Sequence, residues 1–127
     1  MHRWILPLLL LSLALSAGCG GDSDSPLSVG PAQNGQTVVL DAGQRLVVEL
    51  PGNPTTGFEW SVVRADPTLF RLEDSSFSAD SSAIGAGGTF SFRFELLRPG
   101  ADDLRLEYSR SWENAPVDSF SLSVTAR

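Results

Sequence analysis

Few side chains in this sequence could act as a nucleophile, a general base or a metal ligand. The 127 residues include one histidine, His2, one cysteine, Cys19, and no lysine. His2 lies in an N-terminal segment with the features of a secretory signal peptide, which is removed from the mature protein. The mature chain then cannot form a Ser-His-Asp, Cys-His or Ser-Lys site, nor a zinc site made of His and Cys ligands.

Carboxylates are the remaining candidates for acid–base chemistry. Asp102 and Asp103 are adjacent but follow the sequence RPG, which is typical of a solvated turn. Asp22 and Asp24 could contact calcium weakly, yet they lack the further ligands and the spacing of an EF-hand. We therefore expect no enzyme, no metal site and no cofactor.

The charge of the chain excludes two kinds of partner. All nine basic residues are arginines, against 15 acidic residues, and the net charge is −6, or −7 once Arg3 leaves with the signal peptide. No basic cluster is available to neutralise phosphates, so nucleic acid is not expected as a partner. Polybasic binding to a membrane surface is not expected either.

The N-terminus predicts export and a lipid anchor. Arg3 precedes the apolar run from Ile5 to Leu15, which is too short to span a bilayer. The sequence LSAGC that ends at Cys19 resembles the lipobox of bacterial lipoproteins, in which the cysteine is lipidated, although Ser16 stands where leucine is usual. The alternative is an ordinary signal peptide cut nearby, which would leave an unpaired thiol. By resemblance to Gram-negative lipoproteins, Gly20 after the cysteine favours the outer membrane, facing the periplasm.

These features predict three segments. Residues 1–18 form the signal peptide, residues 19–30 a lipidated and flexible tether, and residues 31–127 one folded domain. With a single cysteine, no intramolecular disulfide can stabilise that domain. We expect a monomer.

Apolar residues alternate with polar ones in five runs, which predicts half-buried strands with one solvated face. The runs are 44–50, 58–64, 89–97, 103–109 and 119–126. Clusters of Gly, Pro, Asn and Asp separate the runs, and no segment has helical periodicity. This pattern predicts an all-β fold, an immunoglobulin-like antiparallel β-sandwich in which Phe and Trp fill the core. Loops distant in sequence can then lie side by side at one end of the sandwich.

Three motifs occur in order on this strand pattern: GNPTTGF (52–58), IGAGGT (84–89) and YSRSWE (108–113). Their order and spacing resemble the chagasin family of protein inhibitors of papain-like cysteine proteases. The resemblance implies an immunoglobulin-like fold whose three loops enter the protease cleft, reversibly and without a covalent bond. The first motif would cover the catalytic centre and the other two would contact the sides of the cleft. The residues so implicated are Asn53, Pro54, Thr55, Thr56, Gly57, Phe58, Gly85, Ala86, Gly87, Gly88, Arg110 and Trp112.

The residue types of the first motif suit such a task. Pro54 restricts the backbone, and Asn53 and Gly57 tolerate turn conformations, so the loop should lose little entropy on docking. Thr55 and Thr56 offer hydroxyl groups without the desolvation cost of a charge. The loop thus presents nothing that a protease could use chemically.

Each motif also has a plainer interpretation. The first could be only a hairpin turn, with Phe58 in the core, and the glycines from Gly85 to Gly88 could form an ordinary bulge. Trp112, in a polar segment, could be a binding residue or a lid on the core. Arg110 could orient Trp112, reach an acidic protease rim, or be a solvated charge at a strand end.

The third motif departs from the family pattern, which has Arg-Pro-Trp where this chain has Arg110, Ser111 and Trp112. Loss of the proline should leave this loop less preorganised, by a few tenths to about 1 kcal/mol. The alternative function is a ligand-binding or adhesion module of a surface lipoprotein. If that function is correct, ligand binding should be unaffected by Thr56→Ala and by Trp112→Ala.

Overall fold

The computed structural model describes residues 25–127. The predicted signal peptide, the lipidation site at Cys19 and most of the predicted tether lie outside the described residues. Strand β1 (Leu27–Val29) pairs with the sheet inside the range 19–30 that we assign to the tether, so the folded domain begins before residue 31.

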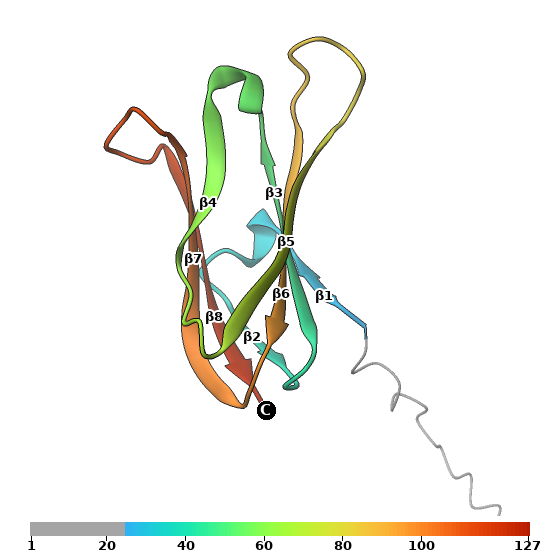
Figure 1. Cartoon of the computed structure of the whole chain (residues 1–127), viewed down its shortest axis with the longest axis vertical. Helices are drawn as coiled ribbons and strands as arrows, with labels where there is room; N and C mark the ends of the chain where they lie inside the picture. The colour runs from blue at the N-terminus through green and yellow to red at the C-terminus, as the bar shows by residue number, and fades with distance from the viewer. Residues whose placement is uncertain (1–24) are drawn as a thin grey trace, which may run out of the picture.

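The described chain forms two four-stranded sheets packed face to face (Figure 1). The first sheet has the order β1-β3-β6-β5 and the second the order β2-β8-β7-β4. The strands after β1 are β2 (Thr37–Leu40), β3 (Arg45–Gly52), β4 (Phe58–Arg64), β5 (Phe70–Ala79), β6 (Gly88–Leu96), β7 (Gly100–Arg110) and β8 (Asp118–Ala126). Within residues 25–127 there are also two short 3-10 helices, η2 (Pro31–Gln33) and η3 (Pro54–Thr56).

The predicted β-sandwich is confirmed, with one refinement. The long strands pair antiparallel, as expected, but the short strands β1 and β2 join β3 and β8 in parallel. The chain crosses from the first sheet to the second through η2. Strand β1 is therefore an edge strand of the first sheet and β2 an edge strand of the second. Short strands at sheet edges limit pairing with other chains.

The core lies between the sheets and follows the predicted alternation. Three phenylalanines of β6 alternate inward, and the leucines of β7 and β8 meet them from the second sheet. Trp60 is 6% exposed, so the expectation that Phe and Trp side chains fill the core is confirmed. The core residues of the five predicted runs are Leu46, Val48, Leu50, Trp60, Phe90, Phe92, Phe94, Leu96, Leu104, Leu106, Phe120, Leu122, Val124 and Ala126.

Strand β5 was not predicted, and its burial explains why. It forms the free edge of the first sheet, and of its ten residues only Phe70 is fully buried. A bulge between Leu72 and Asp74 also shifts its register against β6. Because only Phe70 and Phe77 of this strand turn to the core, and the bulge interrupts the register between them, the sequence of β5 shows no regular alternation.

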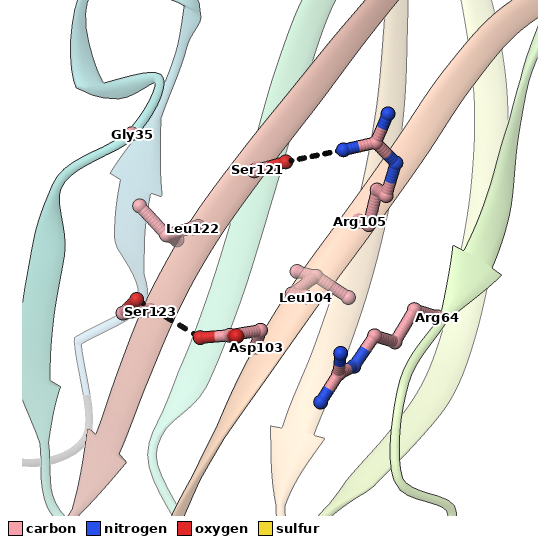
Figure 2. A pocket seen from close by; sticks show the side chains of 8 residues that line it. All are labelled: Gly35, Arg64, Asp103, Leu104, Arg105, Ser121, Leu122 and Ser123. Atoms are coloured by element: carbon pink, nitrogen blue, oxygen red, sulfur yellow. Dashed lines mark hydrogen bonds between the residues drawn. The ribbon is translucent and has the colours of Figure 1, made fainter.

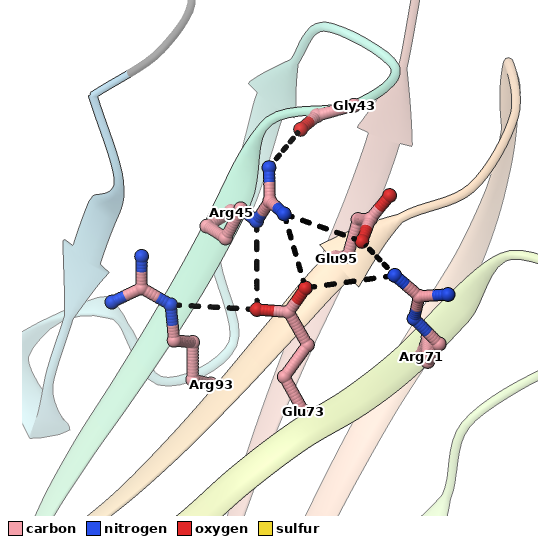
Figure 3. Close-up of polar contacts among 6 residues, drawn as sticks. All are labelled: Gly43, Arg45, Arg71, Glu73, Arg93 and Glu95. Atoms are coloured by element: carbon pink, nitrogen blue, oxygen red, sulfur yellow. Dashed lines mark hydrogen bonds and ion pairs between the residues drawn. The ribbon is translucent and has the colours of Figure 1, made fainter.

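A cluster of charged side chains covers the outer face of the first sheet (Figure 3). Nη2 of Arg45 lies 3.2 Å from Glu73 Oε1 and 3.4 Å from Glu95 Oε2, Arg71 pairs with Glu95, and Arg93 Nε lies 3.5 Å from Glu73. The hydrogen bond from Arg45 lowers the pKa of Glu73. Arg45 is the first residue of β3, so this arginine–glutamate cluster sits at the end of the sheet away from the loop that follows β3.

Candidate functional site: three loops at one end of the sandwich

Three loops gather at one end of the sandwich because β3, β5 and β7 all run toward that end (Figure 1). The first loop is residues 53–57 between β3 and β4, the second 80–87 between β5 and β6, and the third 111–117 between β7 and β8. The first loop connects the two sheets, the second belongs to the first sheet and the third to the second sheet. The first loop contacts each of the other two. Together they present one composite surface that carries all three sequence motifs.

Asn53 organises the first loop. Its side-chain Oδ1 accepts hydrogen bonds from the backbone N–H of Thr55 (3.1 Å) and from the Thr55 hydroxyl (2.6 Å). The Thr56 hydroxyl donates to the carbonyl oxygen of Asn53 at 2.6 Å. Asn53 is thus the N-cap of η3, with Pro54 in the first helical position, an arrangement that sequence statistics favour. Every backbone N–H and hydroxyl group from Asn53 to Gly57 thus has an internal acceptor, which restrains the loop.

These bonds also define what Thr55 and Thr56 can offer a partner. Both side chains are exposed, but both hydroxyl protons point back into the loop. A hydroxyl oxygen that donates its proton retains lone pairs that accept hydrogen bonds. The exposed tip of the first loop therefore presents hydroxyl acceptors, uncharged and already oriented.

Asn53 also joins the first loop to the second. Its Nδ2 donates to the carbonyl oxygen of Gly85 at 2.9 Å. Within the second loop, the N–H of Asp80 donates to Gly87 O at 3.0 Å, and Gly85 has a positive φ of 79°. Gly85 therefore needs its lack of a side chain for its backbone conformation.

Gly88 has a different role from the one predicted. It is buried as the first residue of β6, and a Cβ atom there would collide with the carbonyl oxygen of Ser78 in β5. Its small size serves the packing of backbone against backbone inside the sheet. Gly85, Ala86 and Gly87 remain in the loop at the surface.

The third loop leans on the first through Trp112 and Gly57. Gly57 ends η3 with a φ of 82°, and a Cβ atom there would clash with Cη2 of Trp112 and lie 3.1 Å from Cζ2. The rest of the indole faces solvent, since Trp112 is 68% exposed. Trp112 is therefore no lid on the core. It is an exposed aromatic side chain held at one edge by the first loop.

Arg110 is held over an aromatic ring at the end of β7. Its guanidinium carbon lies 4.2 Å from the centre of the Phe58 ring and 5.7 Å from that of Trp112. Its Nη1 pairs with Glu113 Oε1 at 3.1 Å. The expected contact with Trp112 is present, but the guanidinium lies closer to Phe58. A contact of Arg110 with an acidic protease rim stays a prediction. Phe58 is half-buried between Arg110 and Tyr108, so it supports the arginine from below.

Two exposed apolar residues of these loops were not among the predicted binding residues. Ile84 is fully exposed in the second loop, and Val117 is 60% exposed in the third. The sequence carried a usable signal for both, namely a large apolar residue inside a polar turn segment. With Trp112 they are the three large apolar side chains exposed in the second and third loops.

A shallow hollow on the outer face of the second sheet lies away from the loops (Figure 2). It is lined mainly by β7 and β8, where Arg105 donates to Ser121 Oγ at 3.2 Å and Ser123 donates to Asp103 at 2.9 Å. None of the predicted binding residues lines it. Between residues 25 and 127, no group of side chains could hold a metal ion, and no helix is long and apolar enough to cross a membrane.

Comparison with known proteins identifies the class to which this fold and loop surface belong. The sequence model of the chagasin family of peptidase inhibitors, family I42, matches residues 39–124. The match begins in β2, ends in β8 and includes all three loops. The chain therefore belongs to the chagasin family. It is a peptidase inhibitor and not an enzyme, which confirms both predictions.

Individual relatives agree with this assignment. The chain is 34% identical to chagasin of Trypanosoma cruzi over 98 residues, which cover 73% of this chain and 89% of chagasin. The crystal structure of the cysteine protease inhibitor EhICP2 from Entamoeba histolytica superposes with a TM-score of 0.72 at 22% identity, covering 80% of this chain and 95% of that one. The structure of PbICP-C in complex with falcipain-2 gives a TM-score of 0.53 at 17% identity, over 82% and 91% of the two chains.

Proposed function

We propose that this protein inhibits papain-like cysteine proteases reversibly, by inserting its three loops into the active-site cleft without forming a covalent bond. The observation that carries the proposal is the composite loop surface, in which Asn53 and Trp112 tie the first loop to its two neighbours. Membership of the chagasin family supports the target class. A protein with the same fold, PbICP-C, is known in complex with falcipain-2, so this fold can form such a complex.

The first loop suits the position over the catalytic centre. Its exposed tip carries Thr55 and Thr56, whose hydroxyl groups are fixed by Asn53 and bear no charge. A loop that is already ordered loses little conformational entropy when it docks. Neither threonine has a base beside it, so neither hydroxyl is activated for reaction with the protease.

The second and third loops suit the walls of the cleft. They flank the first loop (Figure 1), and they carry exposed apolar side chains, Ile84 in the second loop and Trp112 and Val117 in the third. At protein interfaces a few residues, most often Trp, Tyr and Arg, supply most of the binding energy when they enter a desolvated hollow. Burial of an exposed aliphatic side chain adds to it. Arg110, stacked on Phe58, adds a positive charge beside Trp112.

We also propose that the protein is exported and anchored by a lipid on Cys19, in the outer membrane facing the periplasm. The point where the chain enters the domain supports this arrangement. Nε2 of Gln44 donates to Ser25 O at 3.0 Å, and Leu27 of β1 pairs with Leu46 near the start of β3. The chain thus enters the domain at the end away from the loops. The strand from Arg45 to Gly52 spans roughly 23 Å, so an anchor at the N-terminus leaves the loops pointing away from the membrane.

The anchor is tested by labelling cells with a radioactive fatty acid. Incorporation into the wild-type protein, together with release into the soluble fraction by Cys19→Ser, supports the lipid anchor. An unlabelled protein that is soluble without the substitution contradicts it.

The inhibitory function is tested by titrating papain with the mature protein. We expect stoichiometric loss of activity with no cleaved inhibitor, and weaker inhibition by Thr56→Ala and by Trp112→Ala. The matched control is Val63→Ala, which shortens an apolar residue that is 48% exposed on β4, outside the loops. Full papain activity at micromolar inhibitor, or equal inhibition by all four proteins, would contradict the proposal. The adhesion-module alternative predicts full papain activity.

A further inference from the structure

Tyr108 lies in β7 beneath the three loops and is fixed by aromatic contacts from both sheets. Its ring stacks on Trp60 of β4, with centroids 5.1 Å apart and an interplanar angle of 24°. Phe58 packs against it at 5.2 Å, and Phe90 of β6 meets it edge-on at 6.4 Å. The side chain is half-buried. These neighbours leave the ring no alternative position, so the location of its hydroxyl group is determined by the core.

The hydroxyl group of Tyr108 contacts the backbone of the first loop. The N–H of Asn53 donates to it at 2.8 Å, and the hydroxyl group lies 3.5 Å from the carbonyl oxygen of the same residue. The preceding residue makes this approach possible. A Cβ atom on Gly52 would lie 2.7 Å from Phe90 Cε2 and 3.2 Å from Tyr108 Cε2, so only glycine lets the backbone pass this close to both rings.

The contact reaches all three loops. Through its side chain, Asn53 binds Thr55 in the first loop and Gly85 O in the second. The carbonyl oxygen of Tyr108 itself accepts the N–H of Val117 at 2.9 Å, which closes the base of the third loop. Tyr108 therefore bonds to the first loop through its hydroxyl group and to the third loop through its carbonyl oxygen. It is connected to the second loop through Asn53.

We propose that Tyr108 is a positioning residue, whose hydroxyl group sets the placement of the first and second loops before a protease binds. This inference rests on the proposed function for its consequence and on the contacts above for its geometry. A phenylalanine would fill the same space in the core, so packing does not require the hydroxyl group. Its removal leaves the N–H of Asn53 without its acceptor, and a larger share of the molecules then has the loops apart. The apparent dissociation constant rises by the inverse of the competent fraction.

Tyr108→Phe tests the proposal in the mature protein, with two independent readouts. The first is amide hydrogen exchange of the free protein, where we expect faster exchange in residues 53–57 and 80–87 and unchanged exchange in the paired core of β6, β7 and β8. The second is the affinity for papain, which should fall about tenfold, the size of one net hydrogen bond. The two readouts should change together.

The matched control is Thr68→Ala, which removes a hydroxyl group at the far end of the sandwich. That hydroxyl group donates to Asp66 at 2.7 Å and accepts from Arg98 at 2.8 Å, so its loss lowers stability without touching the loops. We expect Thr68→Ala to lower the melting temperature and to leave both readouts unchanged. A double variant with Asn53→Ala adds a further check, because Tyr108→Phe should lose most of its effect once the Asn53 side chain no longer connects the loops.

The outcomes separate the two proposals. Faster exchange confined to the loops, with weaker papain binding, supports the positioning role. Unchanged exchange in the loops, or an increase spread evenly over the sandwich, would overturn it. If the wild-type protein fails to inhibit papain, the proposed function falls, while the exchange comparison still decides whether Tyr108 positions the loops.

Discussion

The indole ring of Trp112 rests on Gly57, at a point where any side chain on Gly57 would collide with it. Gly57 also has a φ of 82°, a conformation that residues other than glycine adopt at a cost of about 1–2 kcal/mol. A single glycine thus ends η3 and supports the main exposed aromatic residue of the third loop. The first and third loops depend on each other for their shape.

Gly57→Ala should therefore damage inhibition more than stability. We expect at least a tenfold loss of affinity for papain, because the methyl group displaces Trp112 as well as straining the backbone. Isothermal calorimetry measures the affinity and thermal unfolding measures the stability.

The chain provides a matched control for this prediction. Gly35 has a φ of 79°, and a Cβ atom there would meet nothing within 4 Å. Gly35→Ala imposes the same backbone strain away from the loops, so it should lower the melting temperature and leave inhibition unchanged. Equal inhibition by the two variants would show that the contact with Trp112 has no role in binding.

Ser111→Pro should tighten binding by a few tenths to about 1 kcal/mol, because proline reduces the freedom of the unbound loop. Arg110 ends a β-strand, and the residue before a proline favours extended backbone, so the local conformation accepts the change. The dissociation constants of Ser111→Pro and Ser111→Ala, measured side by side, check this. A weaker Ser111→Pro variant would mean that the third loop binds in a conformation that proline prevents.

Ile84→Ser should weaken inhibition without affecting folding. Ile84 is fully exposed in the free protein, so its replacement removes no internal contact. Burial of such a side chain in a protease contributes about 1.5–3 kcal/mol, and we expect a loss of that order. Leu72→Ser is the control, since Leu72 is an exposed leucine of β5 outside the loops. If both variants inhibit equally well, the second loop does not bury its tip.

Stability should depend on pH through Glu73. Its pKa is lowered from the ordinary value of 4.5 by the hydrogen bond from Arg45 and by neighbouring groups. A lowered pKa means that the folded protein binds the proton less well than the unfolded chain. This contribution is complete above about pH 4.5 and is lost as the pH falls through the lower pKa of the folded state.

The melting temperature should therefore fall below about pH 4.5, and less steeply in Glu73→Gln. Thermal unfolding between pH 3 and pH 7 measures this. Inhibition by Glu73→Gln at neutral pH should equal that of the wild type, because the arginine–glutamate cluster lies at the other end of the sheet from the loops. An identical pH profile for both proteins would rule out Glu73 as the cause.

The sequence predicted the strands that bury one face and missed those that do not. The alternation in β3, β4, β6, β7 and β8 reports a dry and a wet face, and the structure has both. Strand β5 forms a wet edge, and β1 and β2 have only three and four residues. Their pairing is decided by contacts distant in sequence, which a local pattern does not contain.

The same reasoning separates what could be predicted of the loop surface from what could not. The motifs located the loops that the structure brings together at one end, and the turn preferences of Asn53, Pro54 and Gly57 are visible in sequence. The contacts between loops were not predictable. That Asn53 reaches Gly85, and that Tyr108 reaches Asn53 across 55 positions, follows only from the packing of the two sheets.

Competition kinetics test the central claim most directly, since three loops in the cleft must exclude the substrate. Papain activity is measured against inhibitor concentration at several substrate concentrations, and the complex is then diluted to follow recovery. We predict an apparent inhibition constant that rises linearly with substrate concentration, and full recovery of activity with intact inhibitor. Inhibition that is independent of substrate, or that persists after dilution, would contradict the claim.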